Sequence, residues 1–182
     1  AWLGARPVEW LLDNAPVGSN WCLIHATHMD ETETRRAAQS GAVAGLCPST
    51  ESSLGDGIFN GLDWIANHGN YGIGSDSNIR ISAPLELATL EYSQRLKHRQ
   101  RNVMAAGPGS TGMMLYTKAL AGGAQALGRA SGAIKAGLWA DLAAINTDHP
   151  ALCALRPEQW LDGLIFAAPD GAITDLWSAG RH

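Results

Sequence analysis

Long apolar runs and an excess of positive charge are both missing from this sequence of 182 residues. No stretch approaches the roughly 18 consecutive apolar residues that a membrane-spanning helix needs, so we expect no membrane partner. Asp and Glu outnumber Lys and Arg by 17 to 13, which gives a formal net charge of -4. Proteins that bind nucleic acid usually carry a basic surface, so nucleic acid is not an expected partner either.

Cysteine is scarce as well. Cys22, Cys47 and Cys153 are the only three, and no two of them stand in a C-x-x-C spacing. This pattern suggests neither a disulfide framework nor a zinc knuckle built on cysteine. We therefore expect a soluble protein of the reducing cytoplasm.

What the chain does contain is a hydrophobic fraction of 46%, enough to bury a core of ordinary domain size. The sequence begins with Ala1 instead of Met, and helix-like sequence follows at once. We expect a piece of a longer protein, although a processed or renumbered complete domain would begin in the same way.

Strand-like and helix-like segments alternate through most of the chain. Short apolar runs predict buried strands at 21–24, 42–47 and 71–74. Amphipathic spacing predicts helices at 7–12, 31–39, 58–67, 84–99 and 111–127, with a polar loop from 48 to 57. Strands that alternate with helices indicate βαβ units and a parallel sheet, hence an α/β fold.

The pattern changes near residue 130. Segments with strand-like sequence and glycine at their turns lie at 133–146 and 173–179. They predict a small β subdomain, separate from the parallel sheet. We therefore divide the chain into an α/β part, 1–130, and part of a β subdomain, 131–182.

Polar residues follow each of the three predicted parallel strands, at 25–31, 49–56 and 75–78. In a parallel α/β barrel the carboxyl ends of the strands share one rim, so His25 and Asp76 should converge from neighbouring strands. An aspartate can bind Zn²⁺ with one oxygen and accept a proton from water with the other, while an imidazole steadies that water. This chemistry suits hydrolysis at an amidine or aminopurine-like carbon.

Each of these residues also has an ordinary structural explanation. A histidine after a strand is often a hydrogen-bonded structural residue, and Gly-Ser-Asp-Ser at 74–77 is often a plain turn whose aspartate accepts backbone N–H groups. His28, near the start of the next helix, is expected at the surface or behind the residues that contact substrate.

Several ordered segments nonetheless resemble one family. They are His-Ala-Thr-His-x-Asp-Glu at 25–31, Gly-Leu-Cys-Pro-Ser-Thr-Glu at 45–51 and Gly-Ile-Gly-Ser-Asp-Ser at 72–77. Together with Glu-Tyr-x-Gln-Arg-Leu at 91–96 and Gly-x-x-Ala-Asp-Leu at 137–142, they resemble the formimidoylglutamate deiminases, a branch of the metal-dependent amidohydrolases. The resemblance extends over essentially the whole chain.

The resemblance implies the C-terminal part of a (β/α)8 TIM-like barrel, strands six to eight, followed by part of a small β-sandwich-like subdomain. It implies a hydrolase with a single Zn²⁺ or another divalent metal. The small-molecule substrate would be N-formimino-L-glutamate, which is converted to N-formyl-L-glutamate and ammonia in histidine degradation. We expect the intact enzyme to be a homodimer.

By the same resemblance, His25 is the strand-six histidine that contacts the attacking water. Asp76 is the strand-eight aspartate that binds zinc and moves the proton. The family's H-x-H pair and His-x-x-Glu have no counterpart before His25, so the chain by itself is expected to lack activity. Two other hypotheses stay open: a deaminase of a purine or related ring, and an inactive fragment or assembly module.

A barrel arc of three strands would also be structurally incomplete. Parallel strands are normally covered on both faces, so apolar surface should be exposed on 21–24 and 42–46. We expect further protein or a tight partner to cover this surface.

Overall fold

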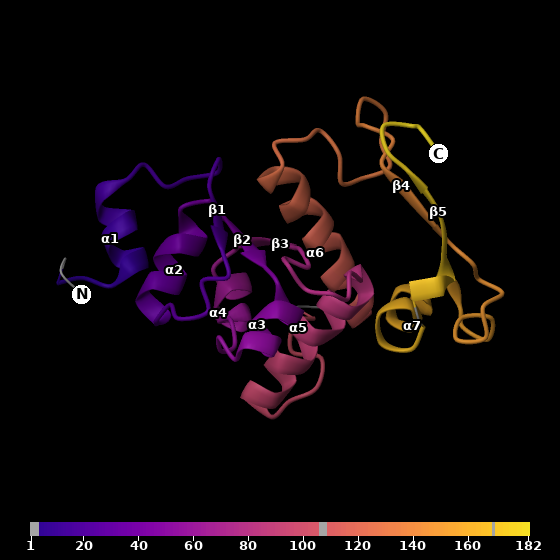
Figure 1. Ribbon diagram of the computed structural model, residues 1–182, viewed down its shortest axis with the longest axis horizontal. Helices are drawn as coiled ribbons and strands as arrows, with labels where there is room; N and C mark the ends of the chain where they lie inside the picture. Colours follow the sequence, from indigo (N-terminus) through magenta and orange to yellow (C-terminus); the bar gives the residue numbers. More distant parts are fainter. Residues whose placement is uncertain (1–3, 106–108, 169) are drawn as a thin grey trace.

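The structure, a computed structural model, describes residues 4–105, 109–168 and 170–182. A parallel sheet surrounded by helices forms the larger part of the molecule, and a two-stranded antiparallel sheet lies apart from it near the C-terminus (Figure 1). In the described part of the chain, no helix combines the length and the apolar character that crossing a membrane requires.

The parallel sheet has three strands in the order β1-β2-β3, namely Cys22–Ile24, Val43–Leu46 and Asn70–Ile73. The register pairs Cys22 with Val43, and Val43 with Asn70. Because the strands are parallel and in step, their carboxyl ends meet at one edge of the sheet. The α/β fold is confirmed, whereas the numbering of these strands as barrel strands six to eight stays a prediction.

Helices precede, connect and follow these strands: α1 (Pro7–Asn14), α2 (Glu31–Gln39), α3 (Pro48–Leu54), α4 (Gly61–Ala66), α5 (Ala83–His98) and α6 (Thr111–Ala126). Local signals set their ends. Pro7 occupies the first turn of α1, where its missing N–H has no helical partner to lose. Asp30 caps α2 by accepting the N–H of Glu33 at 2.8 Å.

Helix α3 corrects the expectation of a polar loop from 48 to 57. Serine and threonine compete for backbone hydrogen bonds and usually weaken a helix, which is why this segment reads as a loop. Here Pro48 starts the helix, and the carboxylate of Glu51 accepts the N–H of Cys47 at 2.8 Å. Gly55 ends it with a left-handed φ of 71°.

Glycines allow α6 to pack directly against β3. A Cβ atom built on Gly122 would lie 1.9 Å from the carbonyl oxygen of Tyr71, so any side chain there would collide with the strand backbone. On the strand side, a Cβ atom built on Gly72 would lie 3.1 Å from the Cα of Gly123. Because glycine has no side chain, Gly122 on the helix and Gly72 on the strand allow α6 to approach β3 closely, and β3 is the strand that leads to Asp76.

A single cluster of buried apolar side chains fills the space between the parallel sheet and its helices. In the middle strand, Val43, Ala44 and Leu46 are all 0% exposed, and Gly45 is half-buried. The expected exposure of 42–46 is therefore wrong, because β2 lies between two other strands and against α6. At the edge strand β1, the exposure expected for 21–24 is found only in part, since Ile24 is 58% exposed but Leu23 is buried.

The C-terminal region forms its own small sheet, in which β4 (Leu142–Ile145) pairs antiparallel with β5 (Ile173–Trp177). The predicted β layer separate from the parallel sheet is thus confirmed, whereas its sandwich-like character and the boundary at 130 stay predictions. A helix that the sequence patterns did not reveal, α7 (Trp160–Phe166), lies between the two strands in sequence and contacts α5 and α6.

Candidate active site

His25 and Asp76 lie just beyond the carboxyl ends of β1 and β3, at the same edge of the parallel sheet. Strand β2 separates these two strands, so the prediction that they are direct neighbours is wrong. The resemblance, which numbers them six and eight, implies a strand between them. The side chains span that gap: the Nε2 atom of His25 is 3.8 Å from the Oδ2 atom of Asp76. The predicted convergence of the two side chains is confirmed, while their catalytic roles stay predictions.

Both residues have left-handed backbone conformations. The φ angle is 62° at His25 and 53° at Asp76. For residues other than glycine, this conformation costs about 1 kcal/mol or more. Strained backbone of this kind clusters at active sites, where the surrounding fold holds it in place. The same conformation occurs at five other described residues, namely Ala26, His68, Arg99, Asn102 and Ala179, so it does not by itself mark the site.

Glu51 of α3 lies beside His25 and forms a cluster with His25 and Asp76. Sequence patterns alone did not assign Glu51 a role. Its Oε1 atom lies 3.2 Å from Nδ1 of His25 and accepts the N–H of Cys47 at 2.8 Å. Glu51 is only 5% exposed. Burial raises the pKa of its carboxyl, although the Cys47 amide and the His25 ring act in the opposite direction. The one available signal was an acidic residue five positions after the end of the buried strand β2.

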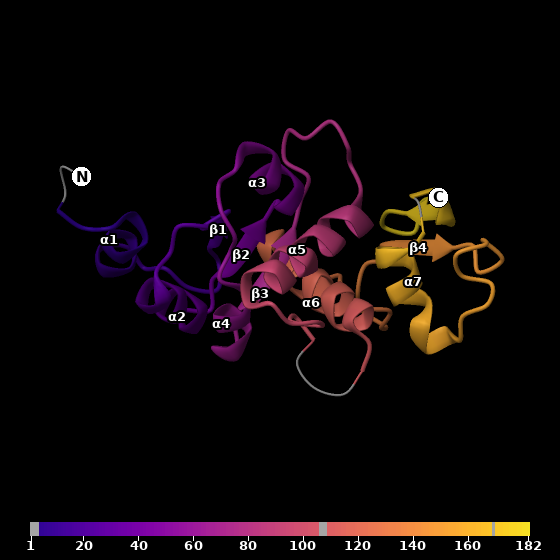
Figure 2. The same cartoon turned by 90° about the horizontal axis from the view of Figure 1, so that it is seen from below.

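Helix α3 is held in place from two directions. Glu86 of α5 is 1% exposed and accepts the N–H of Ser49 at 2.8 Å, as well as the Ser49 hydroxyl. The hydroxyl of Thr50 donates to the carbonyl oxygen of Ser75 at 3.0 Å. Figure 2 shows α3 and the loop between β3 and α5 on the same side of the sheet. The helix that carries Glu51 is thus tied to the loop that carries Asp76.

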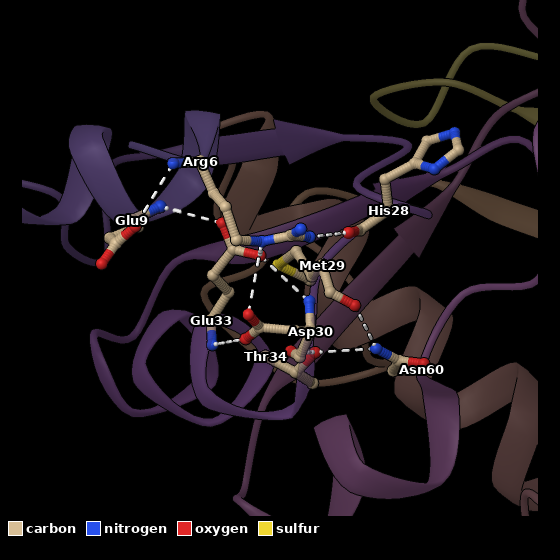
Figure 3. A network of polar contacts seen from close by, with 8 residues as sticks. All are labelled: Arg6, Glu9, His28, Met29, Asp30, Glu33, Thr34 and Asn60. Atoms are coloured by element: carbon tan, nitrogen blue, oxygen red, sulfur yellow. Dashed lines mark hydrogen bonds and ion pairs between the residues drawn. The ribbon is translucent and has the colours of Figure 1, made fainter. Parts of the chain in front are cut away.

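The loop after β1 is held by an ion pair on its outer side (Figure 3). Arg6, just before α1, donates from Nε to the Oε2 atom of Glu33 at 2.7 Å. Glu33 is 3% exposed and also accepts the N–H of Asp30 at 3.0 Å. Arg6 donates in addition to the carbonyl oxygen of His28, whose exposed ring points away from this network (Figure 3). His28 therefore fits the surface position expected for it.

A cavity of about 300 Å³ opens beside His25. Pro7 and Val8 of α1, residues 25–29 of the loop after β1, Glu33 and Asp56 form its walls. Its volume is at the lower end of the range for small-molecule sites, about 300 to 1,000 Å³. Of the three residues His25, Glu51 and Asp76, only His25 lines this cavity.

Cys47 lies next to this cluster but is unsuited to act as a nucleophile. Burial and the carboxylates of Glu51 and Asp76 raise the pKa of its thiol to about 11. The thiolate is the nucleophilic form, so at neutral pH the sulfur stays protonated. Cys47 is therefore not a candidate nucleophile at this edge.

The residues at this edge fit a zinc ion only in part. Carboxylate oxygen is a normal zinc donor, and Asp76 presents a carboxylate that is 41% exposed beside an imidazole. Zinc sites in proteins use three or four protein ligands. Within residues 4–105, 109–168 and 170–182, no group of three or more His, Cys, Asp or Glu side chains is arranged to hold a metal ion. Asp76 can supply one ligand and does not complete a site.

Known proteins resemble the chain over its whole length. The formimidoylglutamate deiminase of Pseudomonas aeruginosa is 47% identical over 182 residues, which are 100% of this chain and 40% of that protein. The crystal structure of an amidohydrolase from Brucella melitensis superposes with a TM-score of 0.91 at 49% identity, covering 99% of this chain and 40% of that one. An adenosine deaminase from Xanthomonas campestris with bound zinc superposes with a TM-score of 0.86 at 25% identity, covering 98% and 40%.

The chain thus spans 40% of the length of the relative and of the two structures compared. The resemblance to formimidoylglutamate deiminase, first seen in the motifs around His25, Glu51 and Asp76, is confirmed. A sequence model named for the amidohydrolases matches residues 5–182, a range that includes both sheets and the edge where these three side chains meet. The protein therefore belongs to the Amidohydrolase family.

Proposed function

We propose that this chain is part of a hydrolase that converts N-formimino-L-glutamate to N-formyl-L-glutamate and ammonia, a step of histidine degradation. The observation that carries the proposal is the meeting of His25 and Asp76 at one edge of the sheet, with 3.8 Å between Nε2 and Oδ2. The identity of 47% to a formimidoylglutamate deiminase supports the choice of substrate.

The reaction adds water to the carbon of the formimino group, breaks the bond between that carbon and the terminal nitrogen, and releases ammonia. A zinc ion, when bound, supplies the polarisation that lowers the pKa of the attacking water. Asp76 would provide one ligand through one carboxylate oxygen and accept the proton of the water through the other. Its partly exposed position at the rim makes it accessible to water and substrate.

His25 would hold the attacking water by a hydrogen bond to Nε2. The separation of 3.8 Å between Nε2 and Asp76 is too long for a good direct hydrogen bond, so the two groups are not tied to each other. Both therefore stay available to a water molecule between them. The remaining metal ligands and the groups that bind the carboxylates of the substrate are not assigned to residues of this chain.

Ammonia release and metal content of the intact protein test this proposal. We expect turnover of N-formimino-L-glutamate with about one zinc per protein chain, and little or no turnover of adenosine. The opposite substrate preference would indicate a deaminase of purine-type rings. A protein that binds no zinc and turns over neither substrate would indicate an inactive assembly module, and either result would overturn the proposal.

A further inference from the structure

We infer that Glu51 is a positioning residue, which holds the His25 ring in the tautomer whose Nε2 atom can accept a hydrogen bond from the attacking water. The catalytic consequence of this inference rests on the proposed function. The contact between the two side chains does not depend on any substrate.

The two nitrogens of the His25 ring face different carboxylates. Nδ1 is 3.2 Å from Oε1 of Glu51, and Nε2 is 3.8 Å from Oδ2 of Asp76. A neutral imidazole carries its proton on one nitrogen only, and the other nitrogen is an acceptor. The shorter contact, to Glu51, is within hydrogen-bond distance and the longer one is not.

The surroundings of Glu51 decide which nitrogen carries that proton. Its Oε1 atom already accepts the N–H of Cys47 at 2.8 Å, and a backbone amide can only donate. This oxygen is therefore placed as an acceptor, and Nδ1 of His25 completes its hydrogen bonds by donating to it. With the proton on Nδ1, Nε2 has a free lone pair that points toward Asp76.

Glu51 is also positioned firmly enough for this role. It is 5% exposed, and the helix on which it lies is tied to α5 through Ser49 and Glu86. A buried carboxylate with fixed partners cannot turn away to solvent, so the His25 ring keeps one orientation. Buried partners that orient catalytic imidazoles in this way are a recurring feature of hydrolytic sites.

Loss of the Glu51 carboxylate would affect both rim residues at once. If the proton of the ring moved to Nε2, His25 would donate toward Asp76 and could no longer accept a hydrogen bond from water. The carboxylate of Asp76 would then accept a hydrogen bond from the ring, and it would be less available to accept the proton of the water. A merely structural Glu51 would leave the tautomer of His25 unchanged.

The test is to measure the ring nitrogen shifts of His25 by NMR in intact protein labelled with ¹⁵N-histidine. The His25 signals are identified by their absence in His25→Asn. In the wild type we expect a protonated Nδ1 and an unprotonated Nε2. In Glu51→Gln, which keeps the size but replaces the carboxylate, we expect a shift toward protonated Nε2. The same variant should lose at least about tenfold in kcat, with a smaller change in KM.

Ser49→Ala is the matched control, because it removes one hydroxyl contact of α3 but keeps the bond from the Ser49 backbone N–H to Glu86 and leaves the contact between Glu51 and His25 in place. It should keep the wild-type nitrogen shifts. A wild-type ring protonated on Nε2, or a Glu51→Gln protein with unchanged shifts and kcat, would overturn the inference. If Glu51→Gln does not fold, the wild-type shifts alone still decide the tautomer. Wild-type protein with the expected tautomer but no turnover of N-formimino-L-glutamate would instead count against the proposed function.

Discussion

The parallel sheet and the C-terminal sheet differ greatly in how much apolar surface they bury. The parallel sheet packs against a large cluster in which Trp64 and Tyr71 are 0% exposed. The smaller cluster at the C-terminal sheet has three buried members, Leu152, Leu164 and Ala172. A sheet of two strands is marginal without further packing. The site residues follow strands of the well-packed sheet. The C-terminal sheet packs instead against the small cluster that includes Leu164 of α7.

This difference predicts two kinds of variant. Changes at the rim of the parallel sheet should alter chemistry with little effect on folding. Changes in the C-terminal region should loosen that region and leave the rim residues in place. The experiments below test this separation, beginning with the largest expected effect.

Asp76→Asn should have the largest effect on turnover. The amide keeps an oxygen that can bind metal but cannot accept the proton of water, so zinc is retained. Loss of a general base lowers the rate by about 10² to 10⁴-fold. His25→Asn should spare zinc more fully and also lose turnover. Zinc content and kcat/KM of both variants of the intact protein measure this directly.

The outcome could contradict these roles in two ways. Near-normal turnover in Asp76→Asn would remove Asp76 as the base. Loss of zinc in His25→Asn, with zinc retained in Asp76→Asn, would mean that the two roles are reversed.

Leu46→Ala and Leu152→Ala compare the two clusters, since both side chains are 0% exposed. Removing a fully buried leucine side chain destabilises a protein by about 2 to 5 kcal/mol. We expect Leu46→Ala to destabilise the parallel sheet as a whole. Leu152→Ala should speed amide hydrogen exchange in β4 and β5 but not in β2. Faster exchange in β2 of the Leu152 variant would show that the two regions unfold together.

Gly122→Ala and Gly123→Ala are a matched pair on α6. The first places a Cβ atom 1.9 Å from the Tyr71 carbonyl oxygen, and the second meets no atom within 4 Å. Overpacking of this kind costs about 1 to 3 kcal/mol. Alanine at 123 should be neutral or stabilising by up to about 1 kcal/mol, because glycine disfavours a helix. Urea denaturation of both variants measures the difference, and equal stabilities would show that α6 does not rest on β3 as closely as described.

Asp141→Asn should have the smallest effect. The Arg129 side chain, followed by the Ala179 amide, lowers the pKa of Asp141 to about 2. Because this pKa is below the value of about 3.9 in an unfolded chain, the pair stabilises the folded state above about pH 4. That contribution is lost as the pH falls toward 2. Exchange rates in β4 between pH 5 and 2 should depend less on pH in Asp141→Asn than in the wild type, and an unchanged pH dependence would contradict this.

Much of the parallel α/β part follows from local sequence signals. The predicted helix at 31–39 has the bounds of α2, because the cap at Asp30 and the spacing of buried residues lie in one short segment. The meeting of His25 and Asp76 follows from a general property of parallel sheets. Strand order does not follow from that property. The resemblance, which places His25 after strand six and Asp76 after strand eight, does imply one strand between them, and β2 lies there.

The features that sequence patterns missed depend on distant contacts. Helix α3 is stabilised by Glu86, which is 37 residues from Ser49. The side chain of Glu51 contacts that of His25, 26 residues away. Helix α7 is a short segment whose buried face is defined by contacts with α5 and α6. A pattern within one segment cannot report partners of this kind.

The left-handed backbone at His25 and Asp76 restricts which amino acids these positions can accept in a saturation library. Asn, Asp, His and Gly adopt a positive φ most readily, while Val, Ile and Thr, with their branched Cβ atoms, rarely do. A library scored for abundance should therefore tolerate the first group at both positions and reject the second. Scored for activity, the same library should retain only the native residues. At such positions, protein abundance depends on whether the residue accepts a positive φ, whereas activity depends on one particular side chain. Comparing the two scores would therefore identify the residues at this edge of the sheet without a bound substrate.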